Sequence, residues 1–291
     1  MNLRRYIRTF RNWPSIFFNV YRKNFNFYVK YRDGRKVKVL SEAHLYFLSF
    51  DPKDLQYDHN SDVLSFNFNG NLVKFKGALN NGDVASIFGD ACYKANVNGK
   101  TVIDIGANIG DSAIYFCLNN AERVIALEPF PFSYRYAKIN VAINNIKDKI
   151  EMLNAGYGKD SEVNIKAKKS TTSDIIEITN DGKKINTYSL GTLISMYKLN
   201  NKDDLVLKMD CEGCEYNLLD EPAEILRKFK IVEMEFHYGY KNLESKLEEA
   251  GFSVNHSKPS KSRLSEPSLR KMALINKDLT IGYIYAERHP D

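Results

Sequence analysis

Short apolar runs alternate with helical segments along most of the chain, and this alternation constrains the fold more than any other sequence feature. Strands are expected at residues 102–105, 123–127, 150–153, 205–209 and 231–236. Helices are expected between them at residues 110–119, 132–144 and 214–227. Strands that alternate with helices form a parallel sheet with helices on both faces. We therefore predict an α/β fold built on a mostly parallel sheet.

The C-terminal part is expected to complete this sheet. A further helix and three strands are predicted at residues 243–250, 252–255, 272–276 and 279–286. The last two strands should pair antiparallel across Asn276-Lys277-Asp278, which has the composition of a turn. Residues 159–184 are polar and rich in Lys, Ser and Thr, so a surface insertion is expected there.

The N-terminal 40 residues differ from the rest of the chain in charge. They contain eleven Lys and Arg against one acid, Asp33, whereas the whole chain of 291 residues has a net charge of +6. Apolar residues at near-helical spacing run through this segment, and Trp13-Pro14 interrupts the pattern. The segment is either a basic amphipathic arm that contacts anionic lipid or another polyanion, or a helical arm that packs on the protein. Nucleic acid is not expected as a partner, because the remaining residues are slightly acidic.

Three regions follow from these patterns. Residues 1–40 form the basic amphipathic arm, residues 41–98 a β-hairpin with a following helix, and residues 99–291 the sheet domain. The hairpin is predicted because Asn69-Gly70 lies between alternating apolar residues and both turn positions tolerate positive φ. The helix is expected between residues 82 and 94.

Composition favours an intracellular, cytoplasmic protein, with peripheral membrane association left open. Hydrophobic residues make up 43% of the chain, yet no apolar run reaches the roughly 18 to 20 residues that a membrane-spanning helix needs. The N-terminus lacks the features of a secretory signal. The four cysteines, Cys92, Cys117, Cys211 and Cys214, are too few and too scattered for a disulfide scaffold, so reduced thiols are expected. The last two have the spacing of a redox or zinc pair, but no second pair accompanies them.

The first strand of the sheet leads into the sequence DIGANIG, residues 104–110. Open parallel sheets bind ligands at the carboxyl ends of their strands, which is where this turn is expected. Gly106 and Gly110 allow a tight turn that brings backbone amides close to a ligand. Asn108 replaces the middle glycine of a dinucleotide motif, and the Asp104 carboxylate would crowd a diphosphate. A positively charged ligand without phosphate, such as S-adenosylmethionine, fits this turn better.

Glu128 ends the second strand, where a carboxylate can accept both hydroxyls of an adenosine ribose. NAD-binding proteins share this feature. An NAD-dependent oxidoreductase on a similar sheet therefore stays an alternative, and so does a non-catalytic module that binds S-adenosylmethionine.

Four sequence blocks resemble those of the FkbM-type methyltransferases, a family of S-adenosylmethionine-dependent O-methyltransferases. They are VIDIGANIGDSAIYF, VIALEPFPFSYRYAKINVAINN, LVLKMDCEGCEYNLL and VEMEFH, and the match covers roughly residues 82–256. The resemblance implies a class I methyltransferase fold, which is a Rossmann-like sheet of seven strands with the last one antiparallel. It also implies transfer of a methyl group to a hydroxyl of a glycan or small metabolite. The chain departs from the family pattern in its basic N-terminal arm and in Cys211 and Cys214.

The resemblance also assigns candidate site residues in this sequence. The candidates for binding the cofactor are Asp104, Gly106, Ala107, Asn108, Gly110, Asp111, Glu128, Pro129, Ala155, Gly156 and Asp210. The candidates for the acceptor side are Asp210, Glu212 and His237, with Glu215 close in sequence. Glu212 and Glu215 also suit the first turn of a helix through its dipole alone.

Methyl transfer to a hydroxyl requires a base near the acceptor oxygen. His237, Asp210 and Glu212 are the candidates, and an unperturbed histidine pKa near 6.5 suits a base at neutral pH. A structural hydrogen-bonding role for His237 is the alternative. Strand alternation argues against the convergence of Asp210, Glu212, Glu235 and His237 on Mg²⁺, so no metal is expected.

Overall fold

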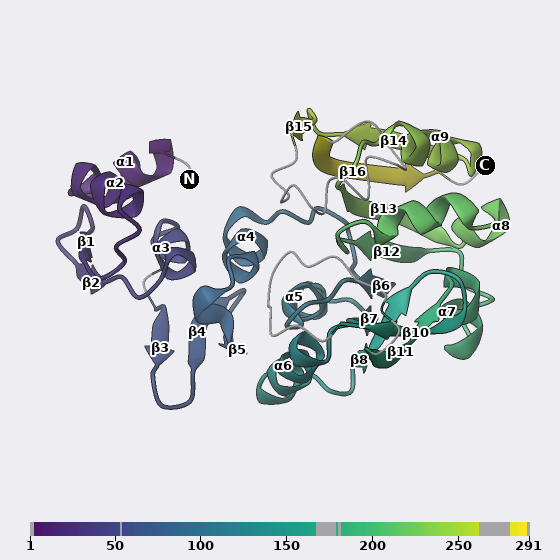
Figure 1. Ribbon diagram of the computed structural model, residues 1–291, viewed down its shortest axis with the longest axis horizontal. Coiled ribbons are helices and arrows are strands. Elements are labelled where there is room, and N and C mark those ends of the chain that lie inside the picture. Colours follow the sequence, from purple (N-terminus) through teal and green to yellow (C-terminus); the bar gives the residue numbers. More distant parts are fainter. Residues whose placement is uncertain (1–2, 53, 167–178, 180–181, 262–279, 290–291) are drawn as a thin grey trace. The chain divides into compact units, whose positions relative to one another are not determined.

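The structure is a computed structural model that describes residues 3–52, 54–166, 179, 182–261 and 280–289 (Figure 1). The chain divides into two compact units. The first comprises Met1–Cys92 and Ile139–Asn145, and the second comprises Tyr93–Lys138 and Ile146–Asp291. All of the candidate site residues belong to the second unit.

The first unit begins with helices and a hairpin around an aromatic core. Its elements are α1 (Leu3–Thr9), α2 (Trp13–Tyr21), β1 (Tyr28–Lys30), β2 (Lys36–Lys38) and α3 (Glu42–Leu48). The buried core consists of Tyr6, Phe10, Ile16, Val29, Tyr31, Val39, Leu45 and Leu48. The predicted interruption near Trp13-Pro14 is confirmed, because α1 ends before it and Pro14 lies in the first turn of α2. The basic N-terminal segment is therefore folded around a core.

A three-stranded antiparallel sheet follows, made of β3 (Gln56–Asp58), β4 (Val63–Phe68) and β5 (Asn71–Lys76). Asn69 and Gly70 connect β4 to β5 with φ of +48° and +79°, which confirms the predicted hairpin. The unit continues with η1 (Ala78–Asn80) and α4 (Asp83–Asp90). Helix α4 lies inside the helix predicted between residues 82 and 94. Helix α3, which has Ser41 as its N-cap, was not predicted.

The second unit is built on one large sheet. In spatial order its strands are β14 (Phe252–His256), β16 (Thr280–Arg288), β13 (Phe229–Phe236), β12 (Leu205–Met209), β6 (Thr101–Ile105), β7 (Arg123–Leu127) and β8 (Ile150–Leu153). Neighbouring strands pair in parallel, except that β16 runs antiparallel to β13, to β14 and to the short β15 (Ser260–Lys261). The predicted fold, a seven-stranded Rossmann-like sheet whose last strand is antiparallel, is confirmed.

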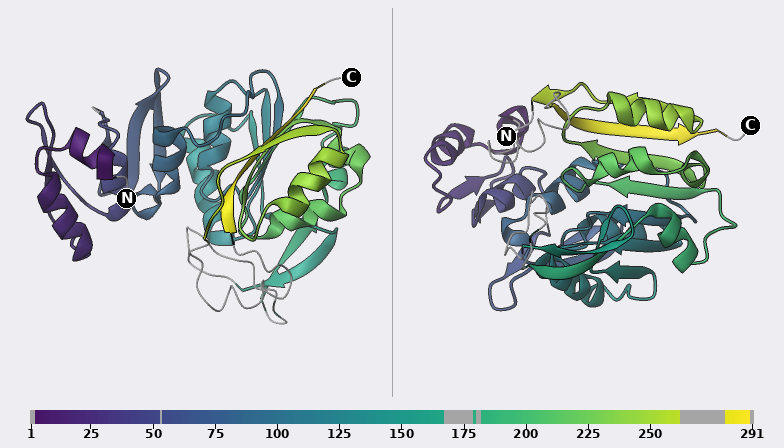
Figure 2. Two further views of the ribbon diagram at one scale, coloured as in Figure 1. Left: turned by 90° about the horizontal axis from the view of Figure 1, so that it is seen from above. Right: turned by 45° about the vertical axis from the view of Figure 1, so that its right-hand side comes forward.

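Helices cover both faces of this sheet (Figures 1 and 2). One face carries α5 (Asp111–Leu118) and the first part of α6 (Pro131–Ile143), and the other carries α7 (Leu190–Met196), α8 (Ala223–Leu226) and α9 (Lys241–Glu249). Side chains alternate along β6, so Ile103 and Ile105 point into the leucine-rich core formed with α7, α8 and α9. Asp104 points to the opposite face, where it meets Ser112 of α5. The alternation thus places a carboxylate beneath α5.

Two details differ from the sequence predictions. The helix predicted at residues 214–227 is split into the 3₁₀ helix η2 (Cys214–Asp220) and α8, because Pro222 between them cannot continue a helix. The predicted surface insertion overlaps a small sheet with the order β10–β11–β9, formed by β9 (Ala155–Tyr157), β10 (Ser161–Ile165) and β11 (Lys183–Tyr188). The strand predicted at residues 272–276 lies outside the described residues.

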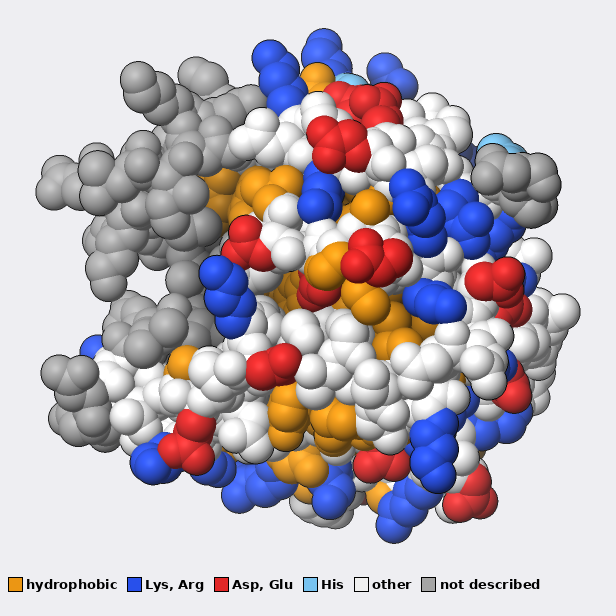
Figure 3. Space-filling model, turned by 90° about the vertical axis from the view of Figure 1, so that its right-hand side faces the viewer, with side chains coloured by type: hydrophobic (Ala, Val, Ile, Leu, Met, Phe, Trp, Pro, Cys, Tyr) orange, Lys and Arg blue, Asp and Glu red, His pale blue; other side chains and the backbone are white. Residues whose placement is uncertain are grey.

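In the part of the chain that the structure describes, no helix is both long enough and apolar enough to cross a bilayer. The face in Figure 3 carries Lys and Arg side chains interspersed with Asp and Glu, with apolar side chains between them. The described residues on this face therefore form no continuous basic surface.

Candidate functional site

A tight turn after β6 lies at the carboxyl edge of the large sheet. Gly106 and Gly110 have φ of +79° and +84°. A Cβ atom at Gly106 would lie 1.9 Å from the carbonyl oxygen of Asp210, so this turn packs backbone against backbone on the segment after β12. The N–H groups of Gly106 and Ala107 both donate to the carbonyl oxygen of Leu127 at 3.0 Å. These contacts fix the geometry of the turn, which requires glycine at position 106.

A buried ion pair lies under this glycine turn. Asp104 is fully buried, and its carboxylate accepts a hydrogen bond from the Ser112 hydroxyl at 2.6 Å and pairs with Lys208 Nζ at 2.9 Å. Lys208 is 1% exposed and also donates to the carbonyl oxygen of Gly106 at 2.8 Å. Burial lowers the pKa of Lys208, but the negative charges of Asp104 and Asp210 outweigh burial and raise it above its ordinary value. The charged amine therefore ties β12 to the glycine turn.

Glu128 closes the other side of the turn. It is 4% exposed, and its Oε2 and Oε1 accept hydrogen bonds from the backbone N–H groups of Asn108 and Phe130, both at 2.8 Å. Burial raises the pKa of Glu128 to about 8, although the two backbone hydrogen bonds act in the opposite direction. A ligand hydroxyl that donates to this carboxyl group would favour its ionised form.

The remaining cofactor candidates lie around this turn or in the small sheet. Ala107 and Asp111 are buried, and Pro129 is half-buried directly after Glu128. Ala155 and Gly156 are buried in β9, where they pair with β11. The cofactor-binding roles of all these residues stay predictions.

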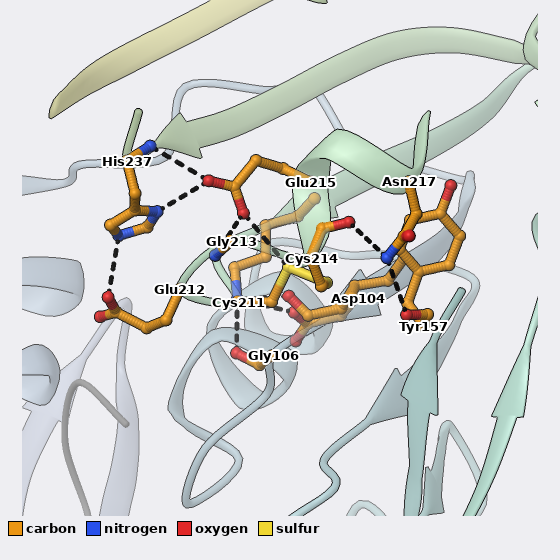
Figure 4. The surroundings of a disulfide bond; sticks show 12 residues. Asp104, Gly106, Tyr157, Cys211, Glu212, Gly213, Cys214, Glu215, Asn217 and His237 are labelled. Carbon is orange, nitrogen blue, oxygen red and sulfur yellow. Dashed lines mark hydrogen bonds and ion pairs between the residues drawn. A yellow bond between two sulfur atoms is a disulfide. The ribbon is translucent and has the colours of Figure 1, made fainter. Parts of the chain in front are cut away.

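A second cluster lies where β12 and β13 end (Figure 4). Asp210 directly follows β12, Glu212 comes two residues later, and His237 directly follows β13. Each offers one oxygen or nitrogen atom, and these atoms lie within 4.8 Å of one another. His237 Nε2 is 3.3 Å from Glu212 Oε2 and 4.0 Å from Glu235 Oε1. The three predicted acceptor-side residues are thus brought together, in a grouping that could also accommodate a divalent cation.

Glu215 fixes the histidine from its other side. This fully buried carboxylate accepts a hydrogen bond from the backbone N–H of His237 at 3.0 Å and lies 2.9 Å from Nδ1. Burial lowers the pKa of His237, but the hydrogen bond to Glu215 and the charges of Glu215, Glu212 and Asp210 outweigh it and raise the pKa to about 10. The pKa near 6.5 assumed from the sequence is therefore wrong. At neutral pH the ring is an imidazolium, with both nitrogen atoms as donors.

Cys211 and Cys214 form a disulfide bond, with their Cα atoms 5.5 Å apart. The prediction of reduced thiols is wrong for this pair, whereas Cys92 and Cys117 are thiols as expected. Reduced thiols were expected because the four cysteines are few and far apart in the sequence as a set. A sharp turn after β12 nevertheless brings Cys211 and Cys214 within bonding distance of each other. The bond closes a four-residue loop that carries one of the acceptor-side carboxylates.

Three residues of these clusters were not predicted from the sequence. They are Lys208 and Ser112, which bind Asp104, and Tyr93, whose hydroxyl donates to Asp210 Oδ2 at 3.3 Å. A lysine within the apolar run LVLKM is a signal that could have identified Lys208, because an apolar strand buries a charge only beside a partner. No comparable local signal exists for Tyr93, which lies far from Asp210 in the sequence.

Comparisons with known proteins agree with the sequence blocks around these clusters. Residues 104–254, just over half of the 291 residues, match the protein family described as methyltransferase FkbM domain. Over 55 residues the chain is 38% identical to the ribosomal protein L11 methyltransferase of Carboxydothermus hydrogenoformans, a match that covers 19% of this chain and only 18% of that protein.

Solved structures with a similar fold include TYW2 of Pyrococcus horikoshii in complex with MeSAdo. The identity is 13% and the TM-score is 0.43, with 79% of this chain and 73% of that chain covered. The ribosomal protein L11 methylase of Lactobacillus delbrueckii subsp. bulgaricus is 19% identical with a TM-score of 0.38, and 74% of this chain and 84% of that chain are covered.

Proposed function

Because the chain belongs to the family of the methyltransferase FkbM domain and its cofactor is S-adenosylmethionine, we propose that it transfers the methyl group to a hydroxyl of a glycan or small metabolite. One observation carries the proposal. Asp210, Glu212 and His237 gather at the carboxyl edge of the sheet, and Asp210 belongs to a segment that packs against the glycine turn. This arrangement supports proton acceptance by a carboxylate beside the turn that we assign to the cofactor. Family membership favours this function over an NAD-dependent oxidoreductase.

The glycine turn supplies the cofactor site in this proposal. The Asp104 carboxylate already binds Lys208 and Ser112. We therefore propose that it stabilises the conformation of the turn and does not contact the cofactor directly. The contact with the ribose hydroxyls is assigned to Glu128. Each of its oxygen atoms accepts one backbone N–H and retains a further lone pair for a ligand.

The reaction needs an aligned acceptor and a proton acceptor. Methyl transfer is an in-line displacement at a carbon that the sulfonium charge already activates, so the protein has to orient the acceptor oxygen and remove its proton. His237 is protonated at neutral pH because its pKa is raised to about 10. We therefore assign proton acceptance to Glu212, with the His237 imidazolium holding this carboxylate in place and Asp210 beside it.

A neutral acceptor suits this site better than a nucleic acid. The carboxylates of Asp210 and Glu212 would repel the phosphate groups of a polyanion. Hydroxyl groups of a sugar, in contrast, can donate hydrogen bonds to carboxylates.

The test uses the intact chain, S-adenosylmethionine with a labelled methyl group, and a panel of sugars and hydroxylated metabolites. Mass spectrometry and NMR then identify the atom that is methylated. Methylation of an oxygen is expected, and methylation of nitrogen or carbon alone would overturn the proposal. Glu212→Gln should reduce turnover by about 100-fold while S-adenosylhomocysteine binding changes by less than about twofold. The matched control is Glu224→Gln on the exposed side of α8, which should change neither quantity.

We further propose that the first unit contacts anionic membranes through α2. Phe17, Phe18 and Tyr21 are 49%, 52% and 82% exposed on this helix, and Arg22 and Lys23 directly follow them. Aromatic rings beside basic side chains are typical of helices that lie in the headgroup region of a bilayer. Glycan acceptors linked to lipid would be available at such a surface.

Co-sedimentation with vesicles that contain phosphatidylserine tests this contact. Replacing Phe17, Phe18 and Tyr21 together by Ser should abolish binding, whereas the control Leu72→Ser, at an exposed position of β5 in the same unit, should leave it intact. Binding of the wild type should weaken as salt is raised. Equal binding by the triple variant and the wild type would reject the role of α2.

A further inference from the structure

The disulfide bond between Cys211 and Cys214 encloses the residue assigned as proton acceptor. It spans Glu212 and Gly213, whose φ values are +56° and +118°. The left-handed conformation is unfavourable for a residue with a Cβ atom, and such a residue persists only where its surroundings fix it. Because the bond joins the positions directly before and after this pair, it restricts the conformations that Glu212 can adopt.

Glu215 supports the same loop from its other side. Its Oε2 accepts a hydrogen bond from the Gly213 N–H at 2.8 Å, and its Oε1 binds the backbone N–H and the ring of His237. The loop, this carboxylate and the imidazole thus form one connected network (Figure 4). The network leaves Glu212 Oε2 3.3 Å from His237 Nε2. The sulfur link adds a covalent constraint to the hydrogen bond that holds Gly213.

The glycine turn has supports of its own. Gly106 donates to Leu127 and accepts from Lys208, and both partners lie outside the disulfide loop. The Cα atom of Cys211 comes within 3.2 Å of where a Cβ at Gly106 would be, but this is a steric contact only. Opening the bond should therefore disturb the acceptor side while the cofactor side keeps its geometry.

We propose that the Cys211–Cys214 bond positions Glu212 for catalysis, and that reduction of this bond stops methyl transfer while cofactor binding persists. This proposal rests on the proposed function, because it concerns the acceptor side of that reaction. Both cysteines are half-buried, which leaves the bond within reach of a small reductant. The closed loop has only four residues, and a disulfide stabilises a fold less when its loop is short. The effect of the bond is accordingly local.

Reduction proceeds by thiol–disulfide exchange with a dithiol. A thiolate of the dithiol attacks one Sγ atom, the S–S bond breaks, and the other cysteine sulfur leaves as a thiolate that takes up a proton. The second thiol of the reductant then displaces the first protein sulfur. The protein gains two thiols, and the reductant becomes a disulfide.

The first measurement establishes the state of the four cysteines. The intact chain is purified without reductant, unfolded, alkylated with iodoacetamide and analysed by mass spectrometry. Only Cys92 and Cys117 should be labelled, and all four cysteines should be labelled after treatment with dithiothreitol. Labelling of all four before reduction would overturn the proposal.

The second measurement reports on Glu212 without any acceptor. NMR of histidine-labelled protein follows the His237 ring, which should shift and titrate at lower pH when reduction releases Glu212. Cys214→Ser should show the shifted resonances without reductant and should no longer respond to it. The control Cys92→Ser should respond like the wild type. Unchanged His237 resonances upon reduction would reject the positioning role.

Cofactor affinity and turnover separate this role from a purely structural one. S-adenosylhomocysteine affinity should change by less than about threefold upon reduction, whereas turnover should fall at least about tenfold once an acceptor is known. Loss of cofactor binding together with turnover would identify a structural bond and contradict the proposal. If no hydroxyl is methylated, the proposed function fails, but a shift of the His237 ring would still support the positioning of Glu212.

Discussion

The two regions that meet at the carboxyl edge of the sheet are organised in opposite ways. Around the glycine turn, the buried carboxylates have partners from the protein itself, since Asp104 binds Lys208 and Glu128 accepts two backbone N–H groups. In the loop after β12, the carboxylate of Glu212 faces the His237 imidazolium and is 17% exposed. In the first region, called the cofactor region below, the buried carboxylates have protein partners before a ligand binds. In the second, called the acceptor region below, the carboxylate of Glu212 stays partly accessible to solvent.

This difference indicates which region binds and which region reacts. A turn with fixed geometry can hold a cofactor in one orientation without reorganising. A partly exposed carboxylate beside a buried cation can exchange a proton with an acceptor. Stability should therefore depend mainly on the glycine turn, and reactivity mainly on the disulfide loop.

Removing the cation under the turn should have the largest effect. Lys208→Met leaves the fully buried Asp104 carboxylate without its cation, so the free energy of unfolding should fall by about 3–5 kcal/mol. Urea denaturation followed by circular dichroism measures this loss. The control Lys202→Met removes an exposed ion pair with Glu122 and should change stability by less than about 1 kcal/mol. Equally small losses in both variants would contradict the stabilising role of the buried pair.

The cofactor region was easier to predict from the sequence because its geometry is mostly local. Gly106, Asn108 and Glu128 belong to consecutive elements, and the spacing of a glycine turn between two strands defines their arrangement. The strands themselves follow from short apolar runs, and β7, β8 and β12 have the predicted limits. The polar strands β10 and β11 were missed because they lack such runs.

The acceptor region depends on contacts between distant parts of the sequence. Asp210 and His237 follow adjacent parallel strands, so their proximity could be expected, but the charge of the imidazole could not. That charge depends on Glu215 and on burial, neither of which spacing reveals. The disulfide bond was not predicted either. The residues that it encloses, Glu212 and Gly213, have positive φ, and the sequence pattern does not show this conformation.

Gly106 is the position where the two regions touch, and its substitution should have the second-largest effect. In Gly106→Ala the new Cβ would lie 1.9 Å from the carbonyl oxygen of Asp210, so the turn and the acceptor segment would have to move apart. Gly99→Ala is a matched control, because Gly99 also has positive φ, at +70°, but no atom within 4 Å of the new Cβ.

The control should lose about 1 kcal/mol of stability from the left-handed conformation alone. Gly106→Ala should lose about 2 kcal/mol more and should also bind S-adenosylhomocysteine more weakly. Denaturation curves and calorimetry measure the two effects. If both variants lost the same free energy of unfolding, the backbone of Gly106 and that of Asp210 would not be packed too closely for a methyl group.

The smallest expected effect is a pH dependence of cofactor affinity that comes from the proton on Glu128. It tests whether the cofactor region changes its protonation state when a ligand binds. Burial raises the pKa of Glu128 to about 8, so most of this carboxyl group is protonated at neutral pH. Ribose hydroxyls that donate to it favour the ionised form, so binding of S-adenosylhomocysteine should release a proton below about pH 8. Affinity should then rise with pH by at most about tenfold per pH unit, and level off above about pH 8.

Calorimetry in two buffers with different ionisation enthalpies counts the released protons. Glu128→Gln keeps the shape of the side chain but cannot ionise, so its affinity should lack this part of the pH dependence. If the wild type and the variant have the same pH dependence, Glu128 does not change its protonation state when the ligand binds. The two regions would then differ more than proposed, because the glycine turn would exchange no proton. Proton exchange would be assigned to Glu212 alone.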